Sequence, residues 1–337
     1  MAAPMAGLSS CDGAIYDNLA PCPEGLKLRF VYDYNMEFAN AFHSQVHCLT
    51  LFVYDEQGRC MAQRTENAAD VLSDENYRMT LDLPAGKYTC VAYGGMECAE
   101  SSFSFKPAPE KGALLTDLRV EMKPDAPGTD LHQMFYGSTT VEVPNGATDY
   151  TEATLPMMKD TNNLRILLQH LSGKPVNVDD FKFTVTENNT LFNYDNALLP
   201  APMIDFDPWV TGQITTGEYD PDSDGGDHQS EPGVTLAYAE FGLSRLVVPQ
   251  KDPSTGLRVS PRLIITRAAD GAKVVDIPLI DYLLLLKSDR YKSMGAQEFL
   301  DRESRWSMIF FLDKANHWVS THIVINDWVV RINNAEL

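Results

Sequence analysis

The segment VHCLTLFVYDEQGRC, residues 46–60, decides the fold class. Residues 46–54 are rich in β-branched and aromatic side chains, which favours an extended strand. Residues 55–58, Asp-Glu-Gln-Gly, form a turn sequence with glycine where a positive φ is needed. A second strand is expected to return from Arg59. Two short strands joined by a tight turn predict an antiparallel hairpin.

The same pattern continues on both sides of this hairpin. Residues 26–32 alternate apolar and charged positions, and residues 79–83 lead through Pro-Ala-Gly into residues 87–93, which predicts another hairpin. Further strands are expected at residues 102–106, 114–122 and 138–143, and one short helix at residues 68–76. Strands at this regular spacing, with little helix, predict an antiparallel β-sandwich.

The second half of the chain begins a new series of strands after the polar turn cluster at residues 144–147. Strands are expected at residues 163–171, 181–187, 236–248, 262–267, 273–277, 306–312, 317–325 and 328–332. Asn326 and Asp327 form either a tight turn or a bulge. One helix is expected at residues 281–302, docked on a sheet. The fold class is therefore mainly β, with two tandem antiparallel β-sandwich domains at residues 25–147 and 148–337 and one helix appended to the second.

Charge and hydropathy exclude two classes of function. The 337 residues carry a formal net charge of −20, whereas nucleic acid and a polybasic membrane patch both demand a basic surface. The longest apolar run, residues 277–286, is interrupted by Asp281 and falls short of the roughly 20 residues that span a bilayer. We therefore expect no nucleic-acid partner and no membrane-spanning helix.

The N-terminus contains a candidate lipidation signal. Leu8-Ser9-Ser10-Cys11 matches a lipobox, the motif at which bacterial lipoproteins are cleaved before a cysteine that receives acyl chains. Residues 1–24 are then a signal remnant and a lipidated tail, with Cys11 as the acylated residue. A triacylated cysteine is a sufficient membrane anchor without a spanning helix. The alternative is an ordinary N-terminal segment with a chance match.

All six cysteines lie in the first 98 residues, at positions 11, 22, 48, 60, 90 and 98. None of their spacings is a C-x-x-C, and no histidine stands at zinc-site spacing beside them. In an exported protein one or two disulfides are expected, with a connectivity that spacing does not reveal. Buried free thiols are the alternative.

One metal signature matches in full. Asp220, Asp222, Asp224 and Glu231, with Gly225 between them, fit the D-x-D-x-D-G-x5-E calcium loop at every ligand position. The flanking residues resemble strands or loops, however, and not the helices that bracket paired calcium loops. A solvated acidic surface loop is the competing interpretation, so no cofactor is assigned, and Ca²⁺ at this loop is the one candidate.

Enzyme signatures are absent from the sequence. It contains no G-x-S-x-G, no H-E-x-x-H, no phosphate-cradling glycine loop and no dinucleotide fingerprint. We therefore predict a non-enzyme with no catalytic residues. The four tryptophans, at positions 209, 306, 318 and 328, would suit a sugar platform, although three stand in predicted strands, where large aromatics usually fill a core. A glycan-binding surface lipoprotein of a polysaccharide uptake system is the alternative function.

Several motifs together resemble the fimbrillin-associated anchor proteins of Bacteroides-type (type V) fimbriae, which are outer-membrane lipoproteins. The resemblance covers nearly the whole chain. It begins with Cys11 and with CPEG at residues 22–25 before LRFVY at 28–32, and continues with LPAGKY at 83–88 before YGG at 93–95. It is most specific in PLIDYL at residues 278–283, QEFLDRE at 297–303 and INDWVVR at 325–331. Asp327 departs from the glycine expected in the last motif.

This resemblance implies two transthyretin-like, Greek-key sandwiches and a surface lipoprotein at the base of a fimbrium. The family's anchors hold the fibre to the outer membrane, help to assemble it and limit its length. The implied partners are fimbrial stalk subunits, joined by strand addition, in which the strand of one subunit completes the sheet of another. The implied location is the outer membrane, through a lipid on Cys11.

Overall fold

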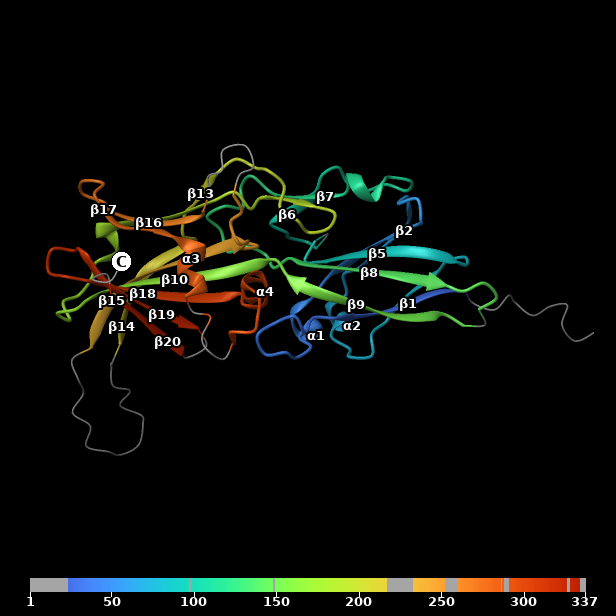
Figure 1. The fold of residues 1–337 in the computed structure, drawn as a ribbon, viewed down its shortest axis with the longest axis horizontal. Coiled ribbons are helices and arrows are strands. Elements are labelled where there is room, and N and C mark those ends of the chain that lie inside the picture. The colour runs from blue at the N-terminus through green and yellow to red at the C-terminus, as the bar shows by residue number, and fades with distance from the viewer. Residues whose placement is uncertain are drawn as a thin grey trace, which may run out of the picture.

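The computed structural model describes residues 24–333 except 97, 148, 217–232, 252–259, 286, 288–290 and 326–327, and describes no side chains from residue 320 onward. Within this part the chain forms four β-sheets, and its two halves lie end to end along the long axis of the molecule (Figure 1). The predicted mainly-β fold class is confirmed. No helix in the described residues is long and apolar enough to cross a membrane.

A seven-stranded sheet forms the N-terminal half. In order, its strands are β3 (Cys60–Glu66), β2 (Leu49–Tyr54), β5 (Gly86–Gly94), β8 (Phe135–Val143), β9 (Thr151–Lys159), β1 (Gly25–Val31) and β4 (Met79–Asp82). Strand β9 pairs with β1 in parallel along its first six residues and with β8 in antiparallel along its last three. The sheet therefore folds over at β9, and apolar side chains of β1 and β4 pack against those of β2 and β5 in one core.

The hairpin predicted from residues 46–60 is confirmed. β2 and β3 pair in antiparallel, and Gly58 in the turn adopts φ +70°. Asp55 stabilises this turn because its carboxylate accepts hydrogen bonds from the backbone N–H groups of Gln57 and Arg59, at 2.9 and 2.8 Å.

The second predicted hairpin, across residues 79–93, is wrong. β4 pairs with β1, while β5 pairs with β2 and β8. The Leu83 N–H bonds instead to the Glu24 carbonyl, at 3.2 Å, next to the β1 edge. Alternating apolar residues in both strands face the same core from opposite layers, so the pattern identified the strands without identifying their partners.

The chain passes between its two halves at a single residue. Asp160 alone separates β9 from β10 (Thr161–His170), which belongs to the second large sheet. The polar turn at residues 144–147, taken as the domain boundary in the sequence, lies between β8 and β9, which are paired in the N-terminal sheet. The change of sheet thus occurs inside a nearly continuous extended run.

The C-terminal half is built from two sheets. The larger contains β14 (Val210–Thr216), β15 (Val234–Ser244), β10, β18 (Arg305–Leu312), β19 (Trp318–Ile325) and β20 (Trp328–Asn333). The smaller contains β13 (Ile204–Phe206), β11 (Phe181–Glu187), β16 (Arg262–Arg267) and β17 (Lys273–Pro278). Pairing is antiparallel except between β10 and β18. Buried side chains of β10, β16 and β18 contribute to the core of this half.

The single helix predicted at residues 281–302 is replaced by two short ones, α3 (Leu279–Leu284) and α4 (Ala296–Arg302). Gly295 occupies the N-cap position of α4 in an extended conformation, φ −60° and ψ 155°, which starts a new helix there. The predicted helix at residues 68–76 is present as the one turn α2 (Ala69–Leu72), and α1 (Phe42–Gln45) was not predicted. The 3₁₀ turns η1 (Leu115–Asp117) and η2 (Val178–Asp180) complete the elements.

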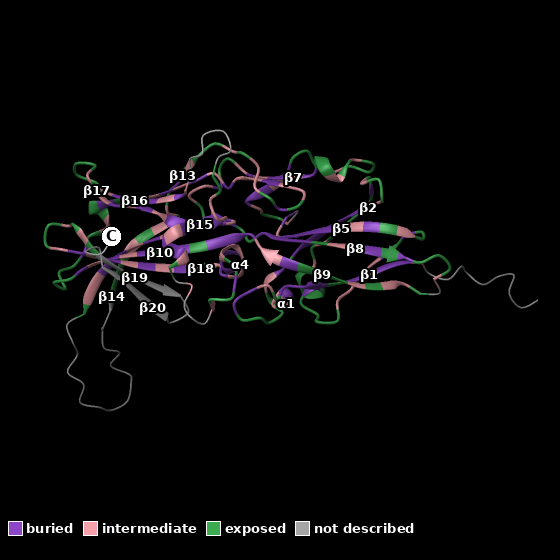
Figure 2. Ribbon diagram, in the orientation of Figure 1, coloured by how far each residue is buried: buried purple, intermediate pink, exposed green. Residues whose placement is uncertain are grey.

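A small third layer joins the two halves. β12 (Leu191–Asn193) of the C-terminal half pairs with β7 (Arg119–Met122) of the N-terminal half, and β7 pairs with β6 (Phe103–Phe105). One continuous apolar cluster includes Phe52, Val120 and Ile166, from three different sheets. The buried residues therefore run along the whole molecule (Figure 2), which couples the two halves mechanically.

The described cysteines include one bonded pair, Cys48–Cys98, which closes a separation of 50 residues. Cys60 and Cys90 are free and buried, and burial raises the pKa of the Cys90 thiol to about 12. Among the described cysteines, one pair thus forms a disulfide, and the other two are buried thiols of low reactivity. Cys11 and Cys22 lie outside the described residues.

Candidate functional site

The residues singled out for lipid and calcium lie outside the described part of the chain. Cys11 precedes residue 24, and Asp220, Asp222, Asp224 and Glu231 all fall within residues 217–232. Both assignments therefore stay predictions. Among the residues that the structure does describe, no group of three or more His, Cys, Asp or Glu side chains is placed to hold a metal ion.

The tryptophans form no common platform among the described side chains. Trp306 is buried, and its Nε1 donates to Asn162 Oδ1 at 3.0 Å. Trp318 packs edge-on against Phe310, with 5.7 Å between ring centroids. Trp209, just before β14, is 37% exposed. The core interpretation thus holds for Trp306, while Trp209 faces solvent.

An uncharged edge strand is the first surface feature that suits binding of another protein. The four sheets have eight edge strands, namely β3, β4, β6, β12, β13, β14, β17 and β20. Among these, only β14 is longer than three residues and contains neither a charged residue nor a proline. Charges, prolines and short length are the usual devices that block pairing at a sheet edge. β14 carries none of them.

β14 is well formed and accessible. All seven residues, Val210–Thr216, pair in antiparallel with β15, so the strand is held along its whole length at the edge of the sheet (Figure 1). The outer edge of β14 has no neighbouring strand within the described residues. Ile214 is 40% exposed, and Thr211 and Thr215 are also exposed. Such an edge offers backbone N–H and C=O groups, and apolar side chains, to an added strand.

A buried charged triad sets the junction between the two halves. Asp301 in α4 accepts two hydrogen bonds from the Arg245 guanidinium, both at 2.9 Å. Asp160, fully buried between β9 and β10, lies 4.0 Å from Arg245 and accepts from Asn196 Nδ2 at 2.9 Å. We call Asp160, Arg245 and Asp301 the junction triad. It places one half-buried cation between two buried carboxylates.

The electrostatics of the triad follow from its burial. Desolvation raises the pKa of Asp160 to about 7, because the charged carboxylate is removed from water, and nearby Arg245 and the Asn196 hydrogen bond only partly oppose this. The Asp301 hydrogen bonds and charge outweigh desolvation at Arg245 and raise its pKa. Arg245 Nη1 also donates to the Asn196 carbonyl at 2.6 Å. The guanidinium is therefore held charged and fully oriented.

A second arginine clamps a loop of the N-terminal half to α4. The Arg302 guanidinium lies over the rings of Tyr34 and Phe38, at 4.1 and 4.7 Å from their centroids. It also pairs with Glu298 at 2.8 Å. Stacking and charge together fix this loop against the C-terminal half.

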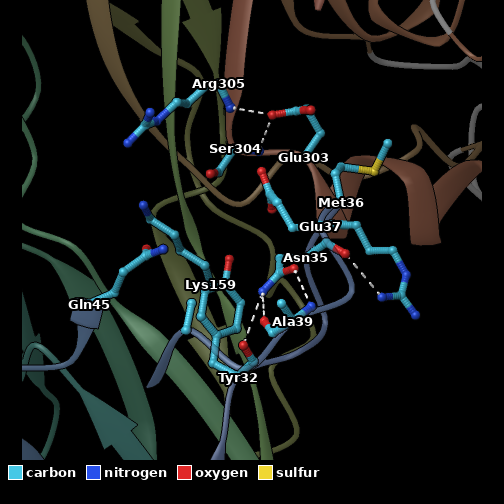
Figure 3. Close-up of a pocket in the computed structure, with 12 residues that line it drawn as sticks. Tyr32, Asn35, Met36, Glu37, Ala39, Gln45, Lys159, Glu303, Ser304 and Arg305 are labelled. Carbon is cyan, nitrogen blue, oxygen red and sulfur yellow. Dashed lines mark hydrogen bonds between the residues drawn. The ribbon is translucent and has the colours of Figure 1, made fainter. Parts of the chain in front are cut away.

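Between the clamp and the start of β18 lies a cavity of about 360 Å³, which we call the junction cavity. Its wall includes Lys159, Arg305, Glu37 and Glu303, contributed by both halves of the chain (Figure 3). The Glu303 carboxylate accepts from the backbone N–H groups of Ser304 and Arg305, at 2.9 and 2.8 Å. The cavity is polar, and it exists only because the two halves meet.

Glu187 provides a pH-dependent test of the packing near this junction. Its side chain is buried at the end of β11, where one oxygen accepts from the Asn188 N–H at 3.0 Å and the other has no partner. Burial raises the pKa of Glu187 to about 8. A raised folded-state pKa means that stability is fully present below the unfolded pKa and is lost as pH rises toward 8.

We therefore expect Glu187→Gln to raise the free energy of unfolding by about 2–3 kcal/mol at pH 8. This is less than the Glu187 pKa shift would give at roughly 1.4 kcal/mol per pKa unit, because the surroundings of the buried carboxylate relax around its charge. At pH 4.5 the variant and the parent should be nearly equal. Urea denaturation at both pH values measures the difference. The matched control is Glu142→Gln on β8, which is exposed and should change little at either pH. Equal stabilities of Glu187→Gln and parent at pH 8 would contradict the assignment.

The described residues form four packed β-sheets with an open uncharged edge and a polar junction, so the fold defines a mainly-β protein. The family model of fimbrillin-A associated anchor proteins Mfa1 and Mfa2 matches residues 19–334, and the chain belongs to this family. It is a family of structural fimbrial anchors and not of enzymes. Because fimbriae are surface fibres, membership implies a cell-surface location.

Individual relatives agree with this assignment. The minor fimbrium anchoring subunit Mfa2 of Porphyromonas gingivalis is 22% identical over 200 residues, which are 58% of this chain and 60% of that protein. The match thus spans less than two thirds of the curated relative. A candidate adhesin from Bacteroides thetaiotaomicron is 48% identical and superimposes with a TM-score of 0.83, covering 94% of this chain and 100% of that one.

Two further solved structures share the fold. A candidate polysaccharide-binding protein from Bacteroides thetaiotaomicron is 31% identical, with a TM-score of 0.75 over 94% of this chain and all of that one. The fimbrial anchor protein Mfa2 from Porphyromonas gingivalis is 16% identical, with a TM-score of 0.64 over 92% of this chain and 100% of that one. At this identity the last likeness concerns the fold alone.

Sequence reasoning missed the junction triad and the junction cavity. Arg245 lies 85 residues after Asp160 and 56 before Asp301, so no local spacing connects the three. Asp160 carried no usable signal, because residues 159–163 read KDTNN, a polar run typical of an exposed turn.

Proposed function

We propose that this chain anchors fimbriae at the cell surface by adding a strand of a stalk subunit to the edge of β14. The observation that carries the proposal is the family match over residues 19–334. We choose this edge because, among the edge strands in the described residues, only β14 is longer than three residues and contains no charged residue and no proline. Backbone hydrogen bonds along seven residues would supply affinity, and the alternating side chains would set the register.

The rigidity of the junction supports an anchoring role. An anchor transmits force from a fibre to its attachment point, so its two ends must not separate under load. The chain meets this need through the continuous apolar cluster, the β7–β12 pairing and the Arg302 clamp. A protein built only to bind a soluble ligand has no comparable need for coupling along its length.

The attachment to the membrane is proposed to be a lipid on Cys11. Residues 12–24 separate that cysteine from β1, which begins at Gly25 at the end of the molecule remote from β14 (Figure 1). With the lipid at one end of the protein, the docking edge at the other end would point away from the outer membrane. The calcium loop at residues 220–231 stays a separate prediction.

Replacement of Cys11 by alanine should move the protein from the membrane fraction to the soluble fraction. The melting temperature should stay within about 1 °C, since the residue precedes β1, the first described strand, by 14 positions. Fractionation followed by immunoblotting measures the distribution, and thermal denaturation of the soluble form checks the fold. Sedimentation of Cys11→Ala with membranes at the parent level would mean that another feature attaches the protein.

The anchoring function itself is tested by deleting the gene in its own bacterium. Fibres should then appear in the culture medium instead of on cells, and expression of the parent chain should return them to the surface. The matched comparison is expression of Cys11→Ala, which should fold and bind fibres yet leave them unattached. Fibres that remain on the deletion strain with unchanged length and number would overturn the proposal.

A further inference from the structure

Two cations without a direct ion pair among the described residues line one side of the junction cavity. Lys159, at the end of β9, is half-buried, and its Nζ lies 5.9 Å from the centroid of the Phe135 ring. Arg305 begins β18 and shares the cavity wall. Among the described residues neither side chain forms an ion pair. Arg305 is exposed, so water screens its charge, whereas Lys159 is half-buried and loses part of its hydration. The two like charges repel each other, and an anion placed between them would offset this repulsion.

The electrostatic environment of Lys159 agrees with this geometry. Burial is the main cause that lowers the pKa of its amine to about 8, and the positive charge of Arg305 lowers it further. At neutral pH the amine still carries its proton, so both walls of this corner are positive. A bound carboxylate would place a favourable charge next to the amine and so offset both effects.

Carboxylates line the opposite side of the same cavity. Figure 3 shows the Glu37 carboxylate across from the Lys159 amine, with the Glu303 carboxylate behind it, bonded to the backbone of Ser304 and Arg305. Glu37 is exposed, and its negative charge raises the pKa of the buried Glu303, after burial itself. Glu37 has no ion pair among the described residues. The cavity therefore presents a positive wall and a negative wall, with an open volume of about 360 Å³ between them.

We propose that the junction cavity binds a small zwitterion of amino-acid or dipeptide size, with its carboxylate between Lys159 and Arg305 and its ammonium group against Glu37. The volume lies at the lower end of the range for small-ligand pockets. A ligand with both charges complements both walls, whereas a simple anion complements only one. The bound molecule would also bridge β9 of the N-terminal half and β18 of the C-terminal half.

Calorimetric titration of the purified protein with ω-amino acids of increasing length tests the proposal. Glycine, β-alanine, γ-aminobutyrate and δ-aminovalerate carry the same two charges at different separations, so affinity should peak at the length that matches the cavity. Acetate and methylammonium, which each carry one of the charges, should bind at least about tenfold more weakly than the best zwitterion.

Two variants connect the binding to the cavity. Lys159→Met keeps an unbranched side chain one atom shorter and removes its charge, and Glu37→Gln removes a charge from an exposed loop position. Each should weaken the best zwitterion about tenfold. The matched controls Lys182→Met and Glu142→Gln alter exposed charges on β11 and β8 and should leave affinity unchanged. Because Glu37 is exposed, that variant tests the proposal even if Lys159→Met folds poorly.

Three results would overturn the proposal. The first is the absence of binding heat from every zwitterion at concentrations up to about 10 mM, which would put every dissociation constant above the millimolar range. The second is binding that both Lys159→Met and Glu37→Gln leave unchanged. The third is acetate binding as tightly as the best zwitterion, which would reduce the cavity to a simple anion site. None of these outcomes bears on fimbrial anchoring, which is tested separately.

Discussion

Replacing Arg245 by methionine should lower the free energy of unfolding by about 3–5 kcal/mol. The substitution retains an unbranched side chain and removes the only cation between the Asp160 and Asp301 carboxylates of the junction triad. Asp301 loses two hydrogen bonds of 2.9 Å, and Asn196 loses the donor to its carbonyl. A buried carboxylate left without its partner keeps the full cost of its desolvation.

Chemical denaturation of parent and variant at neutral pH measures this effect. Arg165→Met is the matched control, since Arg165 forms an ion pair with Glu240 at 3.2 Å whose arginine side chain is 44% exposed. Exposed pairs of this kind contribute about 0–1 kcal/mol. If Arg245→Met destabilises the protein no more than Arg165→Met, the triad does not hold the junction. Adding Asp301→Asn to Arg245→Met should recover part of the loss, because it removes one of the orphaned charges.

Replacing Cys48 and Cys98 together by alanine should cost about 4 kcal/mol. The disulfide closes a separation of 50 residues, and the loop-closure relation gives this value for a loop of that length. The bond ties the residue before β2 to the segment after β5, next to the backbone bond from Gly95 N–H to the Cys48 carbonyl. Its loss frees the unfolded chain more than it perturbs the folded one.

The parent protein provides the control for this prediction. In reducing agent the parent should unfold at the urea concentration of the double variant, and the variant should not respond to reducing agent. Cys60 and Cys90 are buried free thiols and should not contribute. If parent and double variant share one midpoint under oxidising conditions, the disulfide does not stabilise the fold.

The sequence predicted local structure better than long-range pairing. Residues 46–60 predicted a hairpin because turn chemistry and strand propensity act over a few residues, and β2 and β3 form it. Residues 79–93 contain equally clear strands, yet the chain crosses between layers there. The sequence did not predict this crossing, because apolar faces on the two sides of the core give the same linear pattern. The helical periodicity at residues 281–302 likewise gave no sign that the helix is interrupted and that a new one starts at Gly295.

The candidate site was accessible to sequence reasoning only in part. An edge strand is defined by what lies beside it, so β14 could not be recognised before the sheet order was known. The lack of charge and proline in VTGQITT, residues 210–216, was nevertheless visible in the sequence. The junction cavity depends on Lys159 and Arg305 meeting across the two halves, which no local pattern encodes.

The central claim is tested most directly by measuring how tightly a purified stalk subunit binds to proline variants of β14. Thr211 and Ile214 are three residues apart, so the N–H of one points to β15 and that of the other points outward. Proline at the outward position leaves the β15 ladder intact and blocks an added strand. The matched pair Ala62→Pro and Thr65→Pro has the same spacing on β3, the edge of the other large sheet.

The account predicts that one of Thr211→Pro and Ile214→Pro keeps the melting temperature of the parent and binds the stalk subunit at least about tenfold more weakly, a loss of roughly 1.4 kcal/mol. The folded β3 variant should bind as the parent does. Parent-level binding by the folded β14 variant, or loss of binding by the folded β3 variant, would show that fimbrial subunits do not dock on β14.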